Sequence, residues 1–336
     1  MSLDREKKIK NFLDQNGWAG SKRSALAGDA SFRTYERITL NNKCAVLMNA
    51  PPPDEDVRPF VTVAQHLIKL GYSAPKIFAI EEEAGLLLLE DLGKNTYTKV
   101  LSSGGDETAL YKLATDVLID LHRRPTKESI PPSLPIYGNG RLLDEVFLTP
   151  QWTYSAFTGV PATEKVRKKY GEIWLELFSH IHAGPKTLVL RDYHVDNLLW
   201  MKERSGIKAC GLLDFQDAVA GHPTYDLMSL LEDARRDLGP GVKAEMIERY
   251  LSAFPELDRK GFETVFSILA AQRHAKVIGI FTRLWKRDGK PDYLTHIPRV
   301  WTLLEAALEN PVLSDLKDWF DNHMPTNMRG FPEITQ

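Results

Sequence analysis

The sequence has only two cysteines in 336 residues, Cys44 and Cys210, which are far apart and belong to no CxxC pair. It therefore predicts neither a disulfide framework nor a cysteine-rich zinc site. Both cysteines stand in apolar, strand-like runs, which favours buried free thiols. No apolar run approaches the roughly twenty residues that a membrane-spanning helix needs. A Walker A sequence is also lacking, so a P-loop nucleotide site is not expected.

An excess of charge of one sign is lacking too. The 43 Lys and Arg residues nearly balance the 45 Asp and Glu residues, giving a net charge of -2 and a pI near 6.5. This balance argues against a nucleic-acid or anionic-membrane partner held by bulk electrostatics. Residues 1–8 are charged rather than apolar, so we expect no secretory signal and a cytoplasmic protein. The charged stretch 233–237 is expected to be a solvated helix end.

Alternation of apolar and polar residues predicts strands near the amino terminus, and helical spacing predicts helices in most of the remaining chain. The expected strands cover residues 24–27, 32–40, 43–48, 77–80 and 85–89. The expected helices cover residues 3–16, 58–70, 111–122, 166–182, 224–236, 241–254, 262–286 and 297–309. The predicted fold class is α+β, with a small N-terminal antiparallel sheet lobe over residues 1–92. A larger, mainly helical C-terminal lobe covers residues 93–336.

A polar segment in the middle of the chain has a spacing typical of phosphoryl transfer. Asp192 and Asn197 are separated by four residues. A kinase catalytic loop needs an Asp near the acceptor hydroxyl and, after a four-residue spacer, an Asn directed at a magnesium ion. Asp214 is a candidate for the second carboxylate that holds the metal against the nucleotide phosphates. These three residues predict an ATP- and Mg²⁺-dependent active site.

The sequence between Asn197 and Asp214 predicts a hairpin. Apolar runs at residues 198–201 and 207–213 flank the polar residues 202–206, which contain the sequence midpoint. Folding the hairpin would therefore bring Asn197 and Asp214 together. One carboxylate, one amide and the substrate phosphates are enough oxygen donors for Mg²⁺. The alternative is that the two residues are ordinary polar groups at the ends of a hairpin.

A candidate phosphate loop lies between the first two expected strands. The small or turn-forming residues Gly28, Asp29, Ala30 and Ser31 could direct backbone N–H groups at nucleotide phosphates. Arg33 follows directly and could add a positive charge. The segment has one glycine rather than a GxGxxG triplet, so an ordinary turn is the alternative.

These residues carry a family resemblance that covers nearly the whole chain. The chain resembles the aminoglycoside phosphotransferase and choline kinase group of protein-kinase-like enzymes, whose catalytic loop commonly reads HGDxHxxN and is followed by an IDxE or IDF motif. Within that group it is similar to bacterial kinases that phosphorylate the anomeric hydroxyl of N-acetylmuramate or N-acetylglucosamine in cell-wall recycling. The matching segments are residues 28–33, 46–52, 190–197, 214–218 and 224–227.

The resemblance implies roles for four polar residues. It makes Asp192 the catalytic base, Asn197 and Asp214 the magnesium ligands, and Asp226 an acid that braces the catalytic loop. Asp226 could equally be a first-turn acid that interacts with its own helix dipole. His194 is expected to be a buried histidine that holds the loop backbone, because nothing in its spacing makes it a metal ligand.

Two positions depart from the family pattern. Kinases place a lysine on the third strand to bind nucleotide phosphates, and here Met48 occupies that position. We hypothesise that Arg33 neutralises part of the phosphate charge instead. Arg191 replaces the glycine that usually precedes the catalytic Asp, and a guanidinium that braces the loop is the simplest interpretation.

The two substrates have weaker signals in the sequence. Backbone groups of Glu90 and Leu92, in the expected linker, are predicted to hold the adenine. Glu145 and Trp152, in the segment 142–158 that we expect to be irregular, and Arg273 are candidates for contacts with the acceptor, by resemblance and position.

The prediction is a small-molecule kinase with ATP and Mg²⁺ as cofactors and an amino sugar as acceptor. The alternatives are an aminoglycoside, choline or homoserine-type kinase, and a nucleotide-binding pseudokinase suggested by Met48. A metal-dependent hydrolase is disfavoured, because no compact cluster of His and carboxylate residues could hold a metal that activates water.

Overall fold

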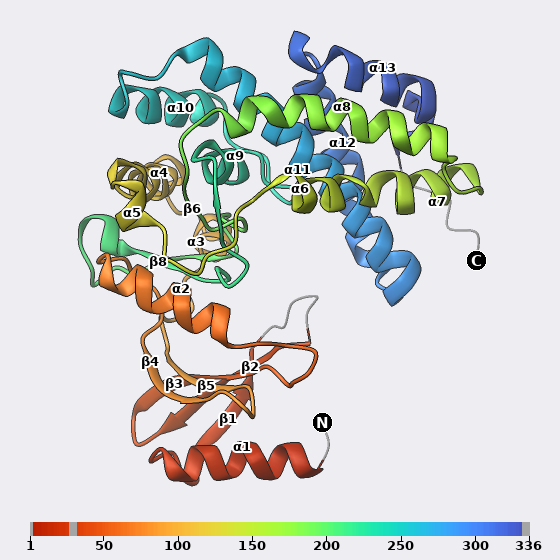
Figure 1. The fold of residues 1–336 in the computed structure, drawn as a ribbon. Coiled ribbons are helices and arrows are strands. Elements are labelled where there is room, and N and C mark those ends of the chain that lie inside the picture. The colour runs from red at the N-terminus through yellow and green to blue at the C-terminus, as the bar shows by residue number, and fades with distance from the viewer. Residues whose placement is uncertain (1–2, 27–31, 331–336) are drawn as a thin grey trace. The chain divides into compact units, whose positions relative to one another are not determined.

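The computed structural model describes residues 3–26 and 32–330, which form two compact units (Figure 1). Unit 1 comprises Met1–Val117 and Val195–Ala218, and unit 2 comprises Leu118–His194 and Val219–Gln336. The lobe division predicted at residues 92 and 93 stays a prediction. Residues 93–117 and 195–218 belong to the same compact unit as the N-terminal sheet.

Unit 1 contains an antiparallel sheet with the strand order β1-β2-β3-β5-β4. Its strands are β1 (Lys22–Ala25), β2 (Thr34–Leu40), β3 (Lys43–Asn49), β4 (Ile77–Glu81) and β5 (Leu86–Glu90). Asn41 and Asn42 connect β2 to β3 with φ values of 48° and 65°, and Leu40 pairs with Lys43. Positive φ at both central residues suits the twist of a two-residue hairpin, and asparagine tolerates it well. The predicted N-terminal antiparallel sheet is confirmed.

Two helices lie on opposite faces of this sheet, α1 (Leu3–Gln15) and α2 (Arg58–Lys69) (Figure 1). The apolar side of α1 forms one core with the sheet, whose members are Ile9, Phe12, Leu13, Ile38, Ala45, Leu47, Leu86 and Leu88. Gly85 permits the tight turn before β5, because a Cβ atom there would lie 1.9 Å from the Ala50 carbonyl oxygen. Its φ of 63° is also one that favours glycine.

A second, two-stranded sheet of unit 1 is the predicted hairpin. It consists of β7 (Leu198–Trp200) and β8 (Cys210–Leu212), with the short 3₁₀ helix η2 (Gly206–Ala209) between them. Backbone hydrogen bonds attach its two strands to other parts of unit 1. The N–H of Trp200 donates to Asn95 and the N–H of Leu212 donates to Ser73, both at 2.8 Å. The helices α3 (Tyr97–Ser102) and α4 (Glu107–Arg123) follow the linker.

Unit 2 is mainly helical. Its α-helices are α5 (Thr126–Ser129), α6 (Asn139–Val146), α7 (Tyr154–Thr158), α8 (Glu164–His182), α9 (Thr224–Leu231), α10 (Val242–Ala253), α11 (Arg259–Asp288), α12 (Ile297–Leu308) and α13 (Ser314–His323). Its other elements are the π-helix η1 (Thr149–Thr153), the 3₁₀ helices η3 (Pro291–His296), η4 (Pro311–Leu313) and η5 (Thr326–Met328), and the paired strands β6 (Thr187–Val189) and β9 (Val219–Gly221).

The 30-residue helix α11 forms the centre of unit 2, with sixteen of its residues buried. It approaches η1 closely at Gly279, where a Cβ atom would lie 2.5 Å from the Leu148 backbone carbon. Among the described residues, no helix combines the length and apolarity that crossing a membrane requires.

Three expectations about local structure are wrong. The helix α9 ends at Leu231 instead of continuing to residue 236, and Asp233 is 4% exposed rather than solvated. Cys44 is exposed near the β2–β3 turn, whereas Cys210 is buried as expected. Residues 142–158, expected to be irregular, form parts of α6, η1 and α7.

Candidate functional site

The hairpin of unit 1 brings Asn197 and Asp214 together. Asn197 directly precedes β7, and Leu213, after β8, donates its N–H to the Asn197 carbonyl oxygen at 2.9 Å. The Asn197 side-chain Nδ2 donates to Asp214 Oδ2 at 3.3 Å. The backbone of Asp214 has a φ of 57°, a left-handed conformation that aspartate tolerates better than most residues. The sequence pattern thus predicted this convergence correctly.

The donor set at this point suits a hard cation. Asp214 offers a carboxylate, Asn197 offers an amide oxygen, and Gln216 holds Asp214 Oδ1 through a 2.8 Å hydrogen bond from its Nε2. The other end of that amide, Gln216 Oε1, is buried and has no hydrogen-bond partner within the described part of the chain. Oxygen ligands of this kind fit Mg²⁺. No group of three or more His, Cys, Asp or Glu residues with metal-binding geometry occurs among the described residues.

The structure describes only some of the unit 1 residues that are predicted to bind the nucleotide. Gly28, Asp29, Ala30 and Ser31 lie outside the described residues. Arg33 is described, and its Nε lies 3.5 Å from Glu55 Oε2.

Of the two predicted linker residues, Glu90 is the last residue of β5, and Leu92 follows this strand. Glu90 accepts a hydrogen bond from Arg204 at 2.8 Å, and its own N–H donates to the Lys76 carbonyl oxygen at 2.7 Å. Leu92 is partly buried. Met48 on β3 is 1% exposed and is part of the core.

The loop that contains Asp192 belongs to unit 2, where Asp226 of α9 fixes its backbone. Asp226 is fully buried, and its two carboxylate oxygens accept hydrogen bonds from the N–H groups of Leu190 and Arg191 at 2.6 and 2.9 Å. Burial raises the pKa of Asp226 to about 7, although the two N–H donors and Arg273 act in the opposite direction. Asp226 therefore binds the loop backbone and changes charge near neutral pH.

The raised pKa of Asp226 gives a testable pH dependence. Between about pH 4 and 7 the folded protein keeps a proton that the unfolded chain has released, so the free energy of unfolding falls as pH rises. In this window we expect the titration of Asp226 to lower the free energy of unfolding by up to about 1.4 kcal/mol per pH unit. Asp226→Asn should abolish this part of the pH dependence. Urea denaturation of both proteins from pH 5 to 8 checks it, and parallel stability curves would contradict it.

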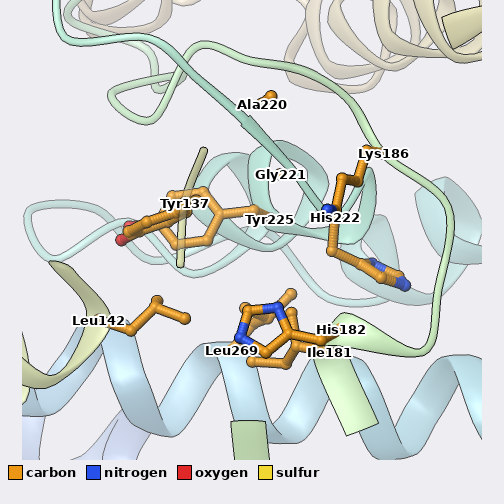
Figure 2. A pocket seen from close by; sticks show the side chains of 10 residues that line it. All are labelled: Tyr137, Leu142, Ile181, His182, Lys186, Ala220, Gly221, His222, Tyr225 and Leu269. Carbon is orange, nitrogen blue, oxygen red and sulfur yellow. The ribbon is translucent and has the colours of Figure 1, made fainter. Parts of the chain in front are cut away.

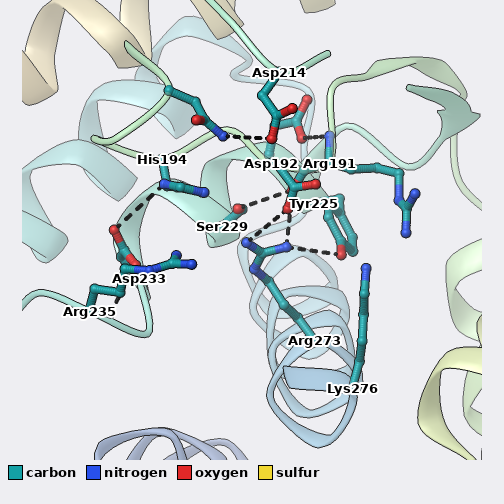
Figure 3. A network of polar contacts seen from close by, with 12 residues as sticks. Arg191, Asp192, His194, Asp214, Tyr225, Ser229, Asp233, Arg235, Arg273 and Lys276 are labelled. Carbon is teal, nitrogen blue, oxygen red and sulfur yellow. Dashed lines mark hydrogen bonds and ion pairs between the residues drawn. The ribbon is translucent and has the colours of Figure 1, made fainter. Parts of the chain in front are cut away.

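Arg191 has an unusual backbone. Its φ of 69° is left-handed, which costs a side-chain-bearing residue about 1–2 kcal/mol. Its carbonyl oxygen accepts hydrogen bonds from Arg273 Nη1 at 3.0 Å and from the Ser229 hydroxyl at 3.3 Å. Arg273 and Ser229 thus hold the carbonyl group before Asp192 in place (Figure 3). Asp226 holds the N–H groups of the two residues before Asp192.

Asp192 has cationic surroundings within unit 2. Arg273 Nη2 lies 3.6 Å from Asp192 Oδ1, and the Asp192 side chain is 35% exposed (Figure 3). Burial raises the pKa of Asp192, but Arg273, Lys276 and other nearby cations outweigh this effect and lower it to about 2. The carboxylate is therefore ionised at any pH at which the protein is expected to be folded.

His194, in the same loop as Asp192, and Asp233 form a buried pair. His194 Nδ1 lies 4.0 Å from Asp233 Oδ2, and both residues are more than nine-tenths buried. Asp233 Oδ1 accepts a hydrogen bond from the Arg235 N–H at 2.9 Å. The predicted buried environment of His194 is confirmed, whereas the solvated environment predicted for the stretch 233–237 is wrong for Asp233.

The three predicted acceptor residues differ in accessibility. The Glu145 side chain on α6 is 11% exposed and is contacted by Arg191 and Lys276. Arg273 on α11 is 8% exposed and lies beside Asp192. Trp152 in η1 is partly buried.

Ser229 and Lys276 were missed by the sequence analysis. Each lies three residues after a predicted site residue on the same helix, Asp226 and Arg273 respectively, so each pair shares a helix face. In α11 the signal was available, because Gln272, Arg273, His274 and Lys276 interrupt an otherwise apolar stretch.

A small enclosed cavity of unit 2 lies beside this network (Figure 2). The residues that line it are Tyr137, Leu142, Ile181, His182, Lys186, Ala220, Gly221, His222, Tyr225 and Leu269. Burial lowers the pKa of His222 to about 4, so its ring is neutral near pH 7. Neither Asp192 nor Arg273 lines the cavity, and we therefore do not assign it to the candidate site.

Comparison with known proteins agrees with this geometry. The model of the phosphotransferase enzyme family, APH, matches residues 22–260. The chain is 36% identical to the N-acetylmuramate/N-acetylglucosamine kinase of Caulobacter vibrioides, over 98% of this chain and 99% of that protein. It is also 36% identical to the protein of the same name from Pseudomonas aeruginosa, over 86% of this chain and 85% of that protein.

Solved structures show the same fold at low sequence identity. A choline/ethanolamine kinase family protein from Mesorhizobium loti has a TM-score of 0.63 at 13% identity, over 94% of this chain and 98% of that chain. The GDP complex of aminoglycoside 2'-phosphotransferase-IIIa has a TM-score of 0.60 at 14% identity, over 92% and 99%. The predicted α+β, protein-kinase-like fold is thereby confirmed.

The fold and the family match define an enzyme that transfers a phosphoryl group to an alcohol or sugar acceptor. The chain belongs to the phosphotransferase enzyme family.

Proposed function

We propose that this enzyme uses ATP and Mg²⁺ to phosphorylate an N-acetylated amino sugar, at the anomeric hydroxyl of N-acetylmuramate or N-acetylglucosamine. The observation that carries the proposal is the name shared by four relatives at 33–36% identity, each matched over at least 84% of this chain. We assign roles in this reaction to Asp192 of unit 2 and to Asn197 and Asp214 of unit 1.

In the proposed mechanism, Asp192 orients the attacking hydroxyl by accepting its hydrogen bond. A carboxylate whose pKa is lowered to about 2 is a weak base, so early proton removal contributes little. Loose phosphoryl-transfer transition states develop little charge on the nucleophile and depend mainly on alignment. Arg273 keeps the Asp192 carboxylate ionised.

Asn197 and Asp214 are the proposed magnesium ligands, and Gln216 orients Asp214 through its 2.8 Å hydrogen bond. When bound, the metal would neutralise negative charge on the nucleotide phosphates. Arg33 and backbone N–H groups of residues 28–31 are proposed to bind those phosphates. Backbone groups of Glu90 and Leu92 are proposed to hold the adenine.

The charges around Asp192 support a neutral or anionic acceptor. Arg273, Lys276, His194 and Arg191 together lower the pKa of Asp192, which indicates a positive local potential. Acetylation removes the charge of an amino sugar, and a muramate adds a carboxylate. A quaternary ammonium or an aminoglycoside would instead bring a positive charge to this environment. Trp152 and Arg273 are the proposed acceptor contacts.

Incubation with ATP, Mg²⁺ and a panel of acceptors tests the proposal. The panel comprises N-acetylmuramate, N-acetylglucosamine, an aminoglycoside, choline and homoserine. Phosphorus NMR should show a sugar 1-phosphate only with the first two acceptors. A product from choline, homoserine or an aminoglycoside would support one of the alternative kinases. Nucleotide binding without any phosphorylated product would indicate a pseudokinase, which Met48 alone suggests.

A further inference from the structure

Glu145 is the centre of a buried polar cluster in unit 2, which we call the Glu145 cluster. Its members are Glu145, Arg191, Lys276, Gln272 and Tyr137. Lys276 Nζ lies 3.3 Å from Glu145 Oε1, which also accepts a hydrogen bond from Arg191 Nη2. Gln272 and Tyr137 donate to Oε2 at 2.8 and 2.5 Å.

This carboxylate is directed at protein groups rather than at solvent. Both of its oxygens have two donors, and its side chain is 11% exposed. Burial raises the pKa of Glu145, but Lys276 and Arg191 outweigh this effect and keep it below the usual value, so the group is ionised. The Arg191 side chain is 8% exposed and therefore depends on a counterion.

Arg191 holds the backbone conformation that Glu145 can stabilise. Its φ of 69° is one that glycine adopts freely and that other residues adopt rarely. The family resemblance implies that related catalytic loops usually have glycine at this position. In this chain an arginine adopts that conformation, and its guanidinium contacts a carboxylate on α6. Asp192 is the next residue.

We propose that Glu145 is a positioning residue that acts through Arg191. Its carboxylate anchors the guanidinium, the anchored side chain stabilises the left-handed backbone at position 191, and that backbone directs Asp192. The Arg191–Glu145 pair thus substitutes for the glycine of related loops. This inference rests on the proposed function, because its main readout is phosphoryl transfer, and it gives Glu145 a role other than acceptor contact.

Two substitutions at position 191 separate the backbone effect from the charge effect. Arg191→Ala removes the ion pair but keeps the cost of a positive φ, whereas Arg191→Gly removes both. We expect kcat to fall about 100-fold in Arg191→Ala and less than about 10-fold in Arg191→Gly, with the acceptor KM within about threefold of wild type. Equal losses in the two variants would overturn the proposal.

A double-mutant cycle tests whether Glu145 acts through Arg191. Glu145→Gln alone should lower kcat about 30-fold at an unchanged acceptor KM, and in the Arg191→Gly background it should lower kcat less than about threefold further. An equal loss in both backgrounds, or a loss expressed in KM, would overturn the proposal. This cycle also decides the case if Arg191→Ala does not fold.

A matched control pair lies elsewhere in unit 2. Arg329 Nη1 is 3.1 Å from Glu305, and the Arg329 side chain is 6% exposed. Glu305→Gln should lower the melting temperature and leave kcat unchanged. A fall in kcat comparable to that of Glu145→Gln would make the effect one of general stability and would overturn the proposal.

The cycle has a second readout that does not need an acceptor. In urea denaturation, the losses in the free energy of unfolding caused by the two substitutions should not add up in the double variant, because the pair stabilises the backbone at position 191. If wild type phosphorylates no acceptor, the proposed function fails and this coupling still tests the link between Glu145 and Arg191. Additive free energies of unfolding would overturn that link.

Discussion

Replacing Asp192 by asparagine is expected to lower kcat about 1,000-fold, within the range that a positioned acid or base contributes. Asparagine has nearly the same shape, but it is neutral and presents an NH₂ group to one side of the acceptor hydroxyl. The nucleotide KM should stay within about threefold of wild type, because the proposed role of Asp192 concerns the acceptor. Steady-state kinetics with N-acetylmuramate and ATP measures both constants.

A control for this change lies in the same loop. Asp196 accepts a hydrogen bond from the Thr98 hydroxyl within unit 1, and Asp196→Asn should lower kcat far less than Asp192→Asn. The pH dependence offers a further check, since a pKa of about 2 keeps Asp192 ionised throughout the measurable range. An acid limb of kcat between pH 5 and 7 should therefore come from another group. Near-normal kcat in Asp192→Asn would remove this residue from the mechanism.

The convergence of Asn197 and Asp214 could be predicted from sequence because its geometry is local. The apolar runs on either side of residues 202–206 permit one hairpin register, and that register brings Asn197 and Asp214 together. The strand β6 was not predicted for the opposite reason. It has three residues, all buried, and so has no alternation of exposed and buried positions.

The surroundings of Asp192 could not be predicted because they depend on distant contacts. Asp233 lies in a charged run that resembles a solvated helix end, yet it is buried against His194. Its neighbour Glu232 is buried as well, with His274 at 2.6 Å. The charge of a residue can be read from the sequence, whereas the residue with which it pairs can lie about forty positions away. The same limit applies to the contact between Glu145 and Arg191, which depends on how α6 packs.

Replacing Asp214 by alanine is expected to impair both nucleotide binding and catalysis. The variant loses the carboxylate proposed to hold Mg²⁺, and Gln216 loses its partner. Affinity for Mg²⁺-nucleotide should fall at least about 100-fold, since even residues behind metal ligands affect metal affinity 10- to 100-fold. We expect kcat to fall about 100- to 1,000-fold, as for other groups that stabilise transition-state charge.

Titration calorimetry with and without Mg²⁺ separates this role from a general loss of folding. In wild type, Mg²⁺ should tighten nucleotide binding, whereas in Asp214→Ala it should have little effect, while binding without metal stays similar. Asp217 is an exposed carboxylate three residues further along the chain, and Asp217→Ala should keep the metal response. Because the structure places the Asn197 amide 3.3 Å from Asp214, Asn197→Ala should weaken the metal response as well. A full Mg²⁺ response in Asp214→Ala would mean that other groups hold the cation.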